Sequence, residues 1–211
     1  MINLKIQEPK LLRTIEYKLE DAIRENNFNN MIFTQNIKEE IGLYDITFDS
    51  CIFKGINFNN IDLENIELLD VIFENCDLSN KHFDNTLIQR VKFINCKLYG
   101  VTFIGSSLKD VVYESCNARY INFAEAKISN MIVIDSDFTE MCFQETKLKN
   151  IELNNTKLNK AEIFKTNLNN IDISTCTIQN LMIDNESLQG LIIDRFQSFD
   201  LVGILGVKIK E

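Results

Sequence analysis

The feature that most constrains this chain is an apolar residue at every fifth position. From Phe48 in steps of five to Ile193, all thirty positions are apolar, and only Ala118 among them is small. A composition of 45% hydrophobic residues would place about 13 or 14 apolar residues there by chance. Helices repeat about every 3.6 residues and strands every two, so ordinary amphipathic helices and strands are excluded over this stretch.

A second set of positions lies two residues before these central residues and is small or apolar. It begins Ile46, Cys51, Ile56, and its only charged members are Lys81 and Glu186. We expect Lys81 either to distort the backbone or to extend its ammonium group to solvent. Glu186 is expected to mark the fraying end of the pattern.

Turn-forming residues follow two positions after many central residues, as in Asn65, Asp70, Asn75 and Asn80. Asn and Asp bond to their own backbone and tolerate left-handed geometry. This predicts regular corners in a chain that has only seven glycines and one proline.

Two segments, Cys76-Asp77-Leu78-Ser79-Asn80 and Thr166-Asn167-Leu168-Asn169-Asn170, carry a small residue, Asp or Asn, Leu, and two polar residues. This pattern resembles the pentapeptide-repeat family, and the resemblance covers residues 46 to about 195. It implies an all-β solenoid, a right-handed quadrilateral β-helix in which four pentapeptides make one square coil.

A four-sided coil also predicts that residues twenty positions apart stack, and the sequence sorts that way. The predicted core ladder contains three cysteines in one column and four phenylalanines in another: Cys76, Cys96, Cys116, and Phe83, Phe103, Phe123, Phe143. Thirty repeats make seven and a half coils, a rod of roughly 36 Å at the ~4.8 Å spacing of stacked strands.

The chain divides into three parts: an N-terminal segment over 1–45, the repeat over 46–193 and a C-terminal capping and dimerisation segment over 194–211. Apolar residues at four-residue spacing after a proline predict a short helix over residues 9–26. An irregular first coil is the alternative, because Phe28 and Phe33 fall in the five-residue register.

An apolar stripe is expected on one outer face, at Ile52, Ile72, Val112 and Ile132. Exposed stripes of this kind are usually covered, and the N-terminal segment is the natural cover. If the N-terminal segment does not cover the stripe, the stripe is expected to bind a ligand.

Nothing in the sequence points to catalysis. Buried thiols packing as small apolar groups explain the cysteines, and His82 is the one histidine, at an outward position. No paired catalytic carboxylates, phosphate loop or metal-ligand spacing occur, so we expect no enzyme activity, metal or cofactor. The absence of a signal peptide and of an apolar run long enough to span a bilayer predicts a cytoplasmic protein with no membrane contact.

The net charge of −9 argues against direct binding to nucleic acid. Acidic residues dominate the outward positions of one predicted face: Asp62, Glu64, Asp84, Glu125, Glu145, Glu162, Asp184. Such a face on a rod about as wide as duplex DNA suits a basic DNA-binding groove. Equally, these residues could simply keep a repeat protein soluble.

After Ile193 the pattern changes, and Asp194 is placed to cap a short helix that seals the coil and precedes a brief strand. The run Leu188-Gln189-Gly190, then Gln197, then Leu205-Gly206-Val207 resembles the C-terminal segment of Qnr-type quinolone-resistance pentapeptide proteins. The resemblance implies a homodimer through this segment, with Phe196, Phe199, Leu201 and Leu205 at the interface.

The same resemblance implies binding to DNA gyrase or topoisomerase IV and relief of fluoroquinolone inhibition, by an acidic rod that mimics DNA. The register from Phe48 to Ile193 has no loop insertion, which is similar to the smoother MfpA type. The alternative is a structural or scaffolding rod whose ligand binds the apolar stripe or the N-terminal segment.

Overall fold

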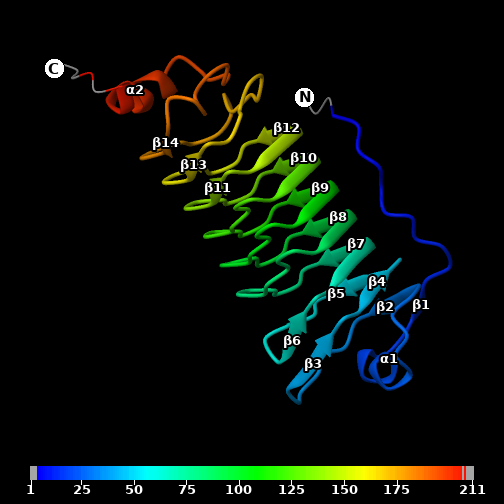
Figure 1. The fold of residues 1–211 in the computed structure, drawn as a ribbon. Coiled ribbons are helices and arrows are strands. Elements are labelled where there is room, and N and C mark those ends of the chain that lie inside the picture. Colours follow the sequence, from blue (N-terminus) through cyan, green and yellow to red (C-terminus); the bar gives the residue numbers. More distant parts are fainter. Residues whose placement is uncertain (1–3, 206, 208–211) are drawn as a thin grey trace.

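The computed structural model describes residues 4–205 and 207. The chain winds into a rod of stacked coils, with α1 near one end and α2 at the other (Figure 1). Its elements are β1 Ile15–Glu16, α1 Leu19–Glu25, β2 Met31–Phe33, β3 Ile41–Tyr44, β4 Thr47–Asp49, β5 Ile52–Lys54, β6 Ile61–Glu64, β7 Glu67–Glu74, β8 Leu87–Ile94, β9 Ser107–Glu114, β10 Lys127–Ile134, β11 Cys142–Gln144, β12 Lys147–Asn154, β13 Glu162–Phe164, β14 Met182–Ile183, α2 Gln197–Val202 and the 3-10 turn η1 Gly203–Leu205.

The strands pair in parallel, and from β2 onward each residue faces the one twenty positions further along the chain. Leu68 pairs with Ile88, Ile88 with Leu108, and Ile128 with Leu148. A nine-stranded sheet contains β7, β8, β9, β10 and β12, and two smaller sheets hold β11, β13, β14 and β3, β6. The predicted right-handed quadrilateral β-helix is therefore confirmed.

Each coil has four faces, which we number in chain order. Strands β7, β8, β9, β10 and β12 bend through a corner and serve the first and second faces, whereas β6, β11, β13 and β14 lie on the fourth. The central residues of one complete coil, from the first face to the fourth, are Leu68, Phe73, Leu78 and Phe83.

The core is a set of stacked side chains. On the fourth face the ring centroids of Phe83, Phe103 and Phe123 follow one another at 5.5 and 5.3 Å. On the second, Phe73 and Phe93 stack at 5.2 Å. These rings are fully buried, and parallel stacking at such spacing is a favourable aromatic geometry.

The inward cysteines pack as small apolar groups. Cys76, Cys96 and Cys116 are buried and unbridged, and the Cys76 and Cys96 thiols each lie 3.4 Å from a carbonyl oxygen of the preceding coil. Burial raises the pKa of the Cys51 thiol to about 11. A protonated thiol of this kind is a poor nucleophile.

Most corners adopt the left-handed conformation predicted for the residue two positions after a central one. Asp70 and Asn95 have φ values of 56° and 51°, and Gly100 has 66°. Asn side chains also bond from coil to coil, as where Asn95 Nδ2 donates to Asn75 Oδ1 at 2.5 Å. Asn thus provides both the backbone conformation and an external ladder.

The two charged inward positions behave differently. At Lys81 the backbone is regular, because its carbonyl accepts the Thr102 N–H at 3.1 Å and its side chain is half-buried. At Glu186 the alignment with the preceding coil shifts locally by one residue, and it is restored where Asp172 pairs with Ile192. Ser187 fills the inward position instead, fully buried, and its Oγ accepts the Thr166 N–H at 3.0 Å.

Both alternatives for the N-terminal segment are present. Only Leu19–Glu25 of residues 9–26 is helical, and it covers the end of the coil with Leu19 and Ala22 buried. Phe28 and Phe33 belong to an irregular first coil, in which Ile32 pairs with Ile52. The helix predicted over 9–18 is wrong, because that part of the chain is held in an extended form by distant residues.

The chain before and into this segment forms an extended N-terminal arm (residues 4–12). The arm runs along the corner between the first and second faces (Figure 1). Its amides donate to three carboxylates: Leu4 to Glu152 at 2.8 Å, Gln7 to Asp110 at 3.1 Å and Lys10 to Asp70 at 2.7 Å. Asp70 and Glu152 lie about four coils apart, ~19 Å, which six extended residues span.

The arm, and not a helix, covers the apolar stripe. Val112 is 7% exposed and Ile132 is 5% exposed, although both occupy outward positions. Leu4, Ile6 and Leu11 of the arm are half-buried. The expected cover from within the chain is present, in extended form.

A buried ion pair lies under the arm. Arg90 donates to both carboxylate oxygens of Asp70, at 2.5 and 2.7 Å. Burial alone would raise the pKa of Asp70, yet the hydrogen bonds from Arg90 and from the Lys10 amide outweigh it, so this pKa lies below its ordinary value. The ionised carboxylate therefore stabilises the folded state.

We predict that Phe103→Ala lowers the free energy of unfolding by about 3–5 kcal/mol, because it empties the centre of the aromatic stack. Urea unfolding followed by circular dichroism measures the change. Leu87→Ala, at an exposed apolar side chain of β8, is the control and should alter stability by no more than about 0.5 kcal/mol. Equal effects of the two substitutions would contradict the stacking account.

We also predict that Asp70→Asn costs roughly 3–5 kcal/mol of stability at neutral pH, because it leaves Arg90 buried without its counter-charge. A lowered folded-state pKa contributes stability above the unfolded value, and this contribution is lost as the pH falls. The difference from the wild type should thus shrink below pH ~4. Urea unfolding between pH 7 and 3 tests this, with Glu64→Gln as the exposed control. A constant difference across that range would refute it.

Candidate functional site

The acidic face predicted from the sequence is the fourth face of the rod. Asp62, Glu64, Glu125 and Glu162 are exposed there, and within the described residues none of them forms an ion pair. Asp62 accepts only a long hydrogen bond of 3.5 Å from the Tyr44 hydroxyl. These four carboxylates are available to a partner.

The other three acidic residues of this face have roles inside the chain. Glu145 pairs with Lys165 at 2.7 Å. Asp84 accepts the Ile104 N–H at 2.8 Å, and Asp184 accepts the N–H groups of Ser187 and Lys165. The hydrogen bond from Ser187 holds the pKa of Asp184 below its ordinary value. Asp84 and Asp184 therefore fix the backbone between coils.

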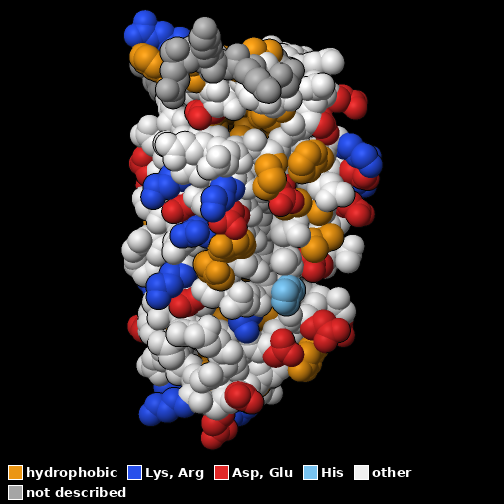
Figure 2. Space-filling view, turned by 90° about the vertical axis from the view of Figure 1, so that its left-hand side faces the viewer, with side chains coloured by type: hydrophobic (Ala, Val, Ile, Leu, Met, Phe, Trp, Pro, Cys, Tyr) orange, Lys and Arg blue, Asp and Glu red, His pale blue; other side chains and the backbone are white. Residues whose placement is uncertain are grey.

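The acidic side chains form two groups and not a continuous column. Figure 2 looks onto this face and shows acidic side chains interrupted by apolar ones and by His82. His82 Nδ1 lies 2.9 Å from Thr102 Oγ1, and Asn122 and Cys142 continue the same neutral line. Glu64 and Glu125 are about three coils apart, ~14 Å along the rod.

The C-terminal end is closed by α2. Asp194 Oδ1 accepts the Gln197 N–H at 2.9 Å, and the buried Gln197 side chain donates to the carbonyls of Ile173 and Cys176, both at 2.8 Å. Two backbone carbonyls at the end of the last coil thus have donors. Asp194 accepts an N–H at the start of the helix, as predicted for a helix cap.

Of the four residues predicted to form a dimer interface, Phe196 and Phe199 project from this end with 63% and 64% of their surface exposed. Leu201 is 8% exposed and packs inside its own chain. The side chain of Leu205, and the brief strand expected after the helix, lie outside the described residues.

A third feature, not predicted from the sequence, is an open slot beside β12. In earlier coils the N–H groups of central and corner residues donate to the next coil, as Phe83 does to Thr102 and Asn85 to Ile104, both at 2.8 Å. The equivalent N–H groups of Leu148 and Asn150 find no acceptor in the part of the chain that the structure describes. The sheet therefore has an unpaired edge here.

The slot exists because the next coil changes its backbone form. Asn167 and Asp172 each accept, through their side chains, the N–H two residues later, at 2.8 Å in both turns. Such local bonds compete with strand pairing, and the chain accordingly turns at residues 169–170 and 174–175 above β12. In the sequence, the signal for these turns is Asn167 and Asp172, which directly precede the consecutive central residues Leu168 and Ile173.

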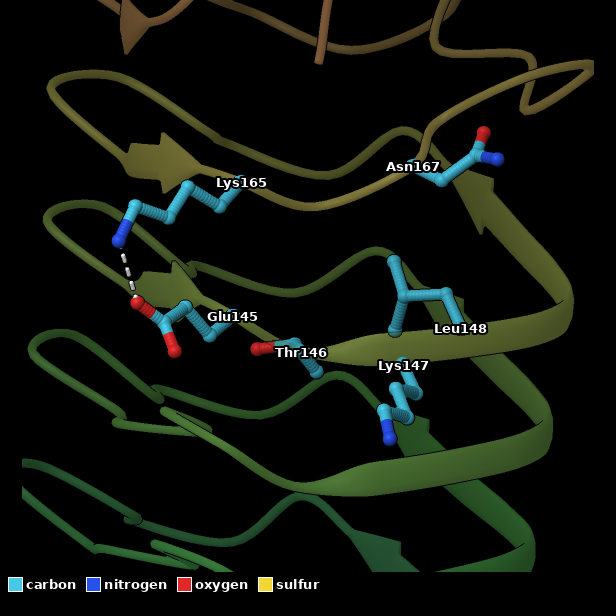
Figure 3. A pocket seen from close by; sticks show the side chains of 6 residues that line it. All are labelled: Glu145, Thr146, Lys147, Leu148, Lys165 and Asn167. Carbon is cyan, nitrogen blue, oxygen red and sulfur yellow. Dashed lines mark hydrogen bonds and ion pairs between the residues drawn. The ribbon is translucent and has the colours of Figure 1, made fainter. Parts of the chain in front are cut away.

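Figure 3 shows the first-face half of this slot, where β12 and the coil above it separate. The cavity has a volume of about 590 Å³ and is lined by Glu145, Thr146, Lys147, Leu148, Lys165 and Asn167. Leu148 is half-buried, whereas its counterparts Ile88, Leu108 and Ile128 are buried. The slot thus exposes core surface beside charged side chains.

Over residues 4–205 and 207, no group of three or more His, Cys, Asp or Glu side chains is arranged to hold a metal ion. Among those same residues, no helix has the length and apolar character to cross a bilayer.

Comparison with known proteins finds a family model that matches part of this coil. The family model described as a pentapeptide repeat region matches residues 66–132. The comparison with curated proteins gives no match.

Several solved structures are similar to this chain. A trypsin-treated form of QnrB1, a plasmid-mediated fluoroquinolone resistance protein, is 17% identical, with 86% of this chain and 89% of that chain covered and a TM-score of 0.40. HetL, a pentapeptide repeat protein involved in heterocyst differentiation regulation from the cyanobacterium Nostoc, is 12% identical, with 84% and 97% covered and a TM-score of 0.37.

The matched segment lies within an unbroken five-residue register, and that register forms parallel coils of twenty residues. This part of the chain is therefore similar to a pentapeptide repeat region.

Proposed function

We propose that this protein is a non-enzymatic binding rod whose acidic fourth face occupies the DNA-binding groove of DNA gyrase or topoisomerase IV and protects the enzyme from fluoroquinolones. The observation that carries the proposal is the set of exposed carboxylates without ion pairs at Asp62, Glu64, Glu125 and Glu162. The protein acts in the cytoplasm, as a homodimer joined at its C-terminal ends.

Electrostatics supports this choice of partner. The chain has a net charge of −9, so a basic groove attracts it from a distance, as it attracts the phosphates of DNA. The two acidic groups, ~14 Å apart, would meet two separate clusters of Lys and Arg in the groove. The resemblance of the C-terminal segment to Qnr-type proteins favours the same partner.

The alternative is a structural or scaffolding rod whose ligand binds the apolar stripe or the N-terminal segment. Of that stripe, Val112 and Ile132 are buried, whereas Ile52 and Ile72 are half-buried. The arm of the N-terminal segment is held by carboxylates along most of its length.

We predict that the purified protein at micromolar concentration protects or inhibits gyrase in a supercoiling assay with fluoroquinolone. Combining Glu64→Gln, Glu125→Gln and Glu162→Gln should weaken the effect about tenfold, because three exposed charge contacts are lost. The matched control, Glu39→Gln with Glu67→Gln and Glu114→Gln, removes as much charge from exposed positions elsewhere and should change little. Neither protection nor inhibition by the wild type would rule out the proposal.

We predict that Phe196→Glu combined with Phe199→Glu gives a monomer by light scattering. The double substitution replaces two exposed aromatic rings of the interface with negative charges. Leu12→Glu, at an exposed apolar residue of the arm, is the control and should leave the dimer intact. An unchanged dimer in the double variant would place the interface elsewhere.

A further inference from the structure

We propose that the unpaired edge of β12 is a docking site for an extended acidic peptide segment of a partner protein, which adds to the sheet as a further strand. This interface is separate from the acidic fourth face. It lies on the first face, and its chemistry is of the opposite sign.

The backbone of β12 offers the first half of the recognition. The N–H groups of Leu148 and Asn150 are directed at the slot and have no acceptor among the residues described. Unpaired strand edges are templates for an added strand, whose main chain gives affinity while its side chains give specificity. The cavity of about 590 Å³ leaves room beside β12, and Leu148 offers an apolar contact at its base.

Lysine side chains around the slot select the partner's charge. Lys109, Lys127, Lys147 and Lys149 are all exposed on the first face, and none has an ion-pair partner in residues 4–205. Lys127 and Lys147 are direct neighbours on paired strands. Like charges opposite one another destabilise a sheet, so acidic side chains placed between them would relieve that repulsion.

The position of these lysines is unusual for a chain with an excess of acidic residues. A second copy docking edge to edge would bring Lys147 and Lys149 against the same lysines. The arm does not fill this half of the slot, because Leu4 is bonded to Glu152, at the second-face end of β12. An acidic segment of another protein therefore fits the slot better than a second copy of this chain or the N-terminal arm.

The test uses the full chain and two fluorescent probes, a blocked Glu-Val repeat of eight residues and the matched Lys-Val repeat. Fluorescence anisotropy should show binding of the acidic probe only. Lys147→Glu combined with Lys149→Glu should weaken that binding at least tenfold, or ~1.4 kcal/mol. Lys18→Glu combined with Lys38→Glu, which reverses two exposed lysines far from the slot, should leave it unchanged.

Amide hydrogen exchange by NMR supplies an independent readout on the wild type. In the free protein the amides of Leu148 and Asn150 should exchange on the order of a hundredfold faster than those of Ile128 and Asn130, and the acidic probe should slow them. Protection already present in dilute free protein would mean that the chain fills its own slot. Protection that grows with protein concentration would mean that a second copy fills it.

Either of those results overturns the proposal. So does equal binding of the two probes, or binding of the acidic probe that leaves both amides unprotected. Failure of the supercoiling assay has no bearing on this outcome, because the residues changed in the two experiments lie on different faces.

Discussion

The structure depends on hydrogen bonding between coils that are twenty residues apart. Phe83 and Asn85 donate to the coil above, and Asp77 and Lys97 donate to the coil below, at 2.8 to 2.9 Å. This ladder closes only if the corners turn the chain inward regularly, and most of them do so with a left-handed residue at a fixed place. The five-residue spacing of apolar side chains follows, because each short face has room for one central residue in the core.

Local regularity explains how much of the fold could be predicted. The register from Phe48 to Ile193, the corners at residues such as Asp70 and Asn95, and the aromatic stack through Phe103 all repeat within the sequence itself. Residues 9–26 could not be predicted in the same way. Their four-residue spacing holds for Leu19 and Ile23, whereas the residues before them are extended because Asp70 accepts the Lys10 amide and β1 pairs with β2.

The candidate sites show the same division. The sequence places acidic residues on one face, but it does not distinguish Glu125, which is exposed, from Asp184, which bonds two backbone amides. That distinction depends on the local one-residue shift at Ser187, whose amide donates to Asp184 at 2.7 Å. Likewise, Leu201 has the apolar character of an interface residue and is instead part of the chain's own cap.

On the first two faces the chain changes from strand to turn after β12, and this change has consequences for both surfaces. Where the residue before the central one is Lys147 or Glu152, the chain forms a strand; where it is Asn167 or Asp172, its side chain accepts the N–H two residues later and the chain turns. A strand stacked on a strand leaves no free edge, and the slot therefore lies where the two forms meet, at β12. On the fourth face, by contrast, the strands β11, β13 and β14 continue through the same level, with Phe143 paired to Ile163 and Ile163 to Ile183. Strand pairing thus continues without a break on the acidic fourth face, whereas the adjoining first face, with its exposed lysines, has the slot.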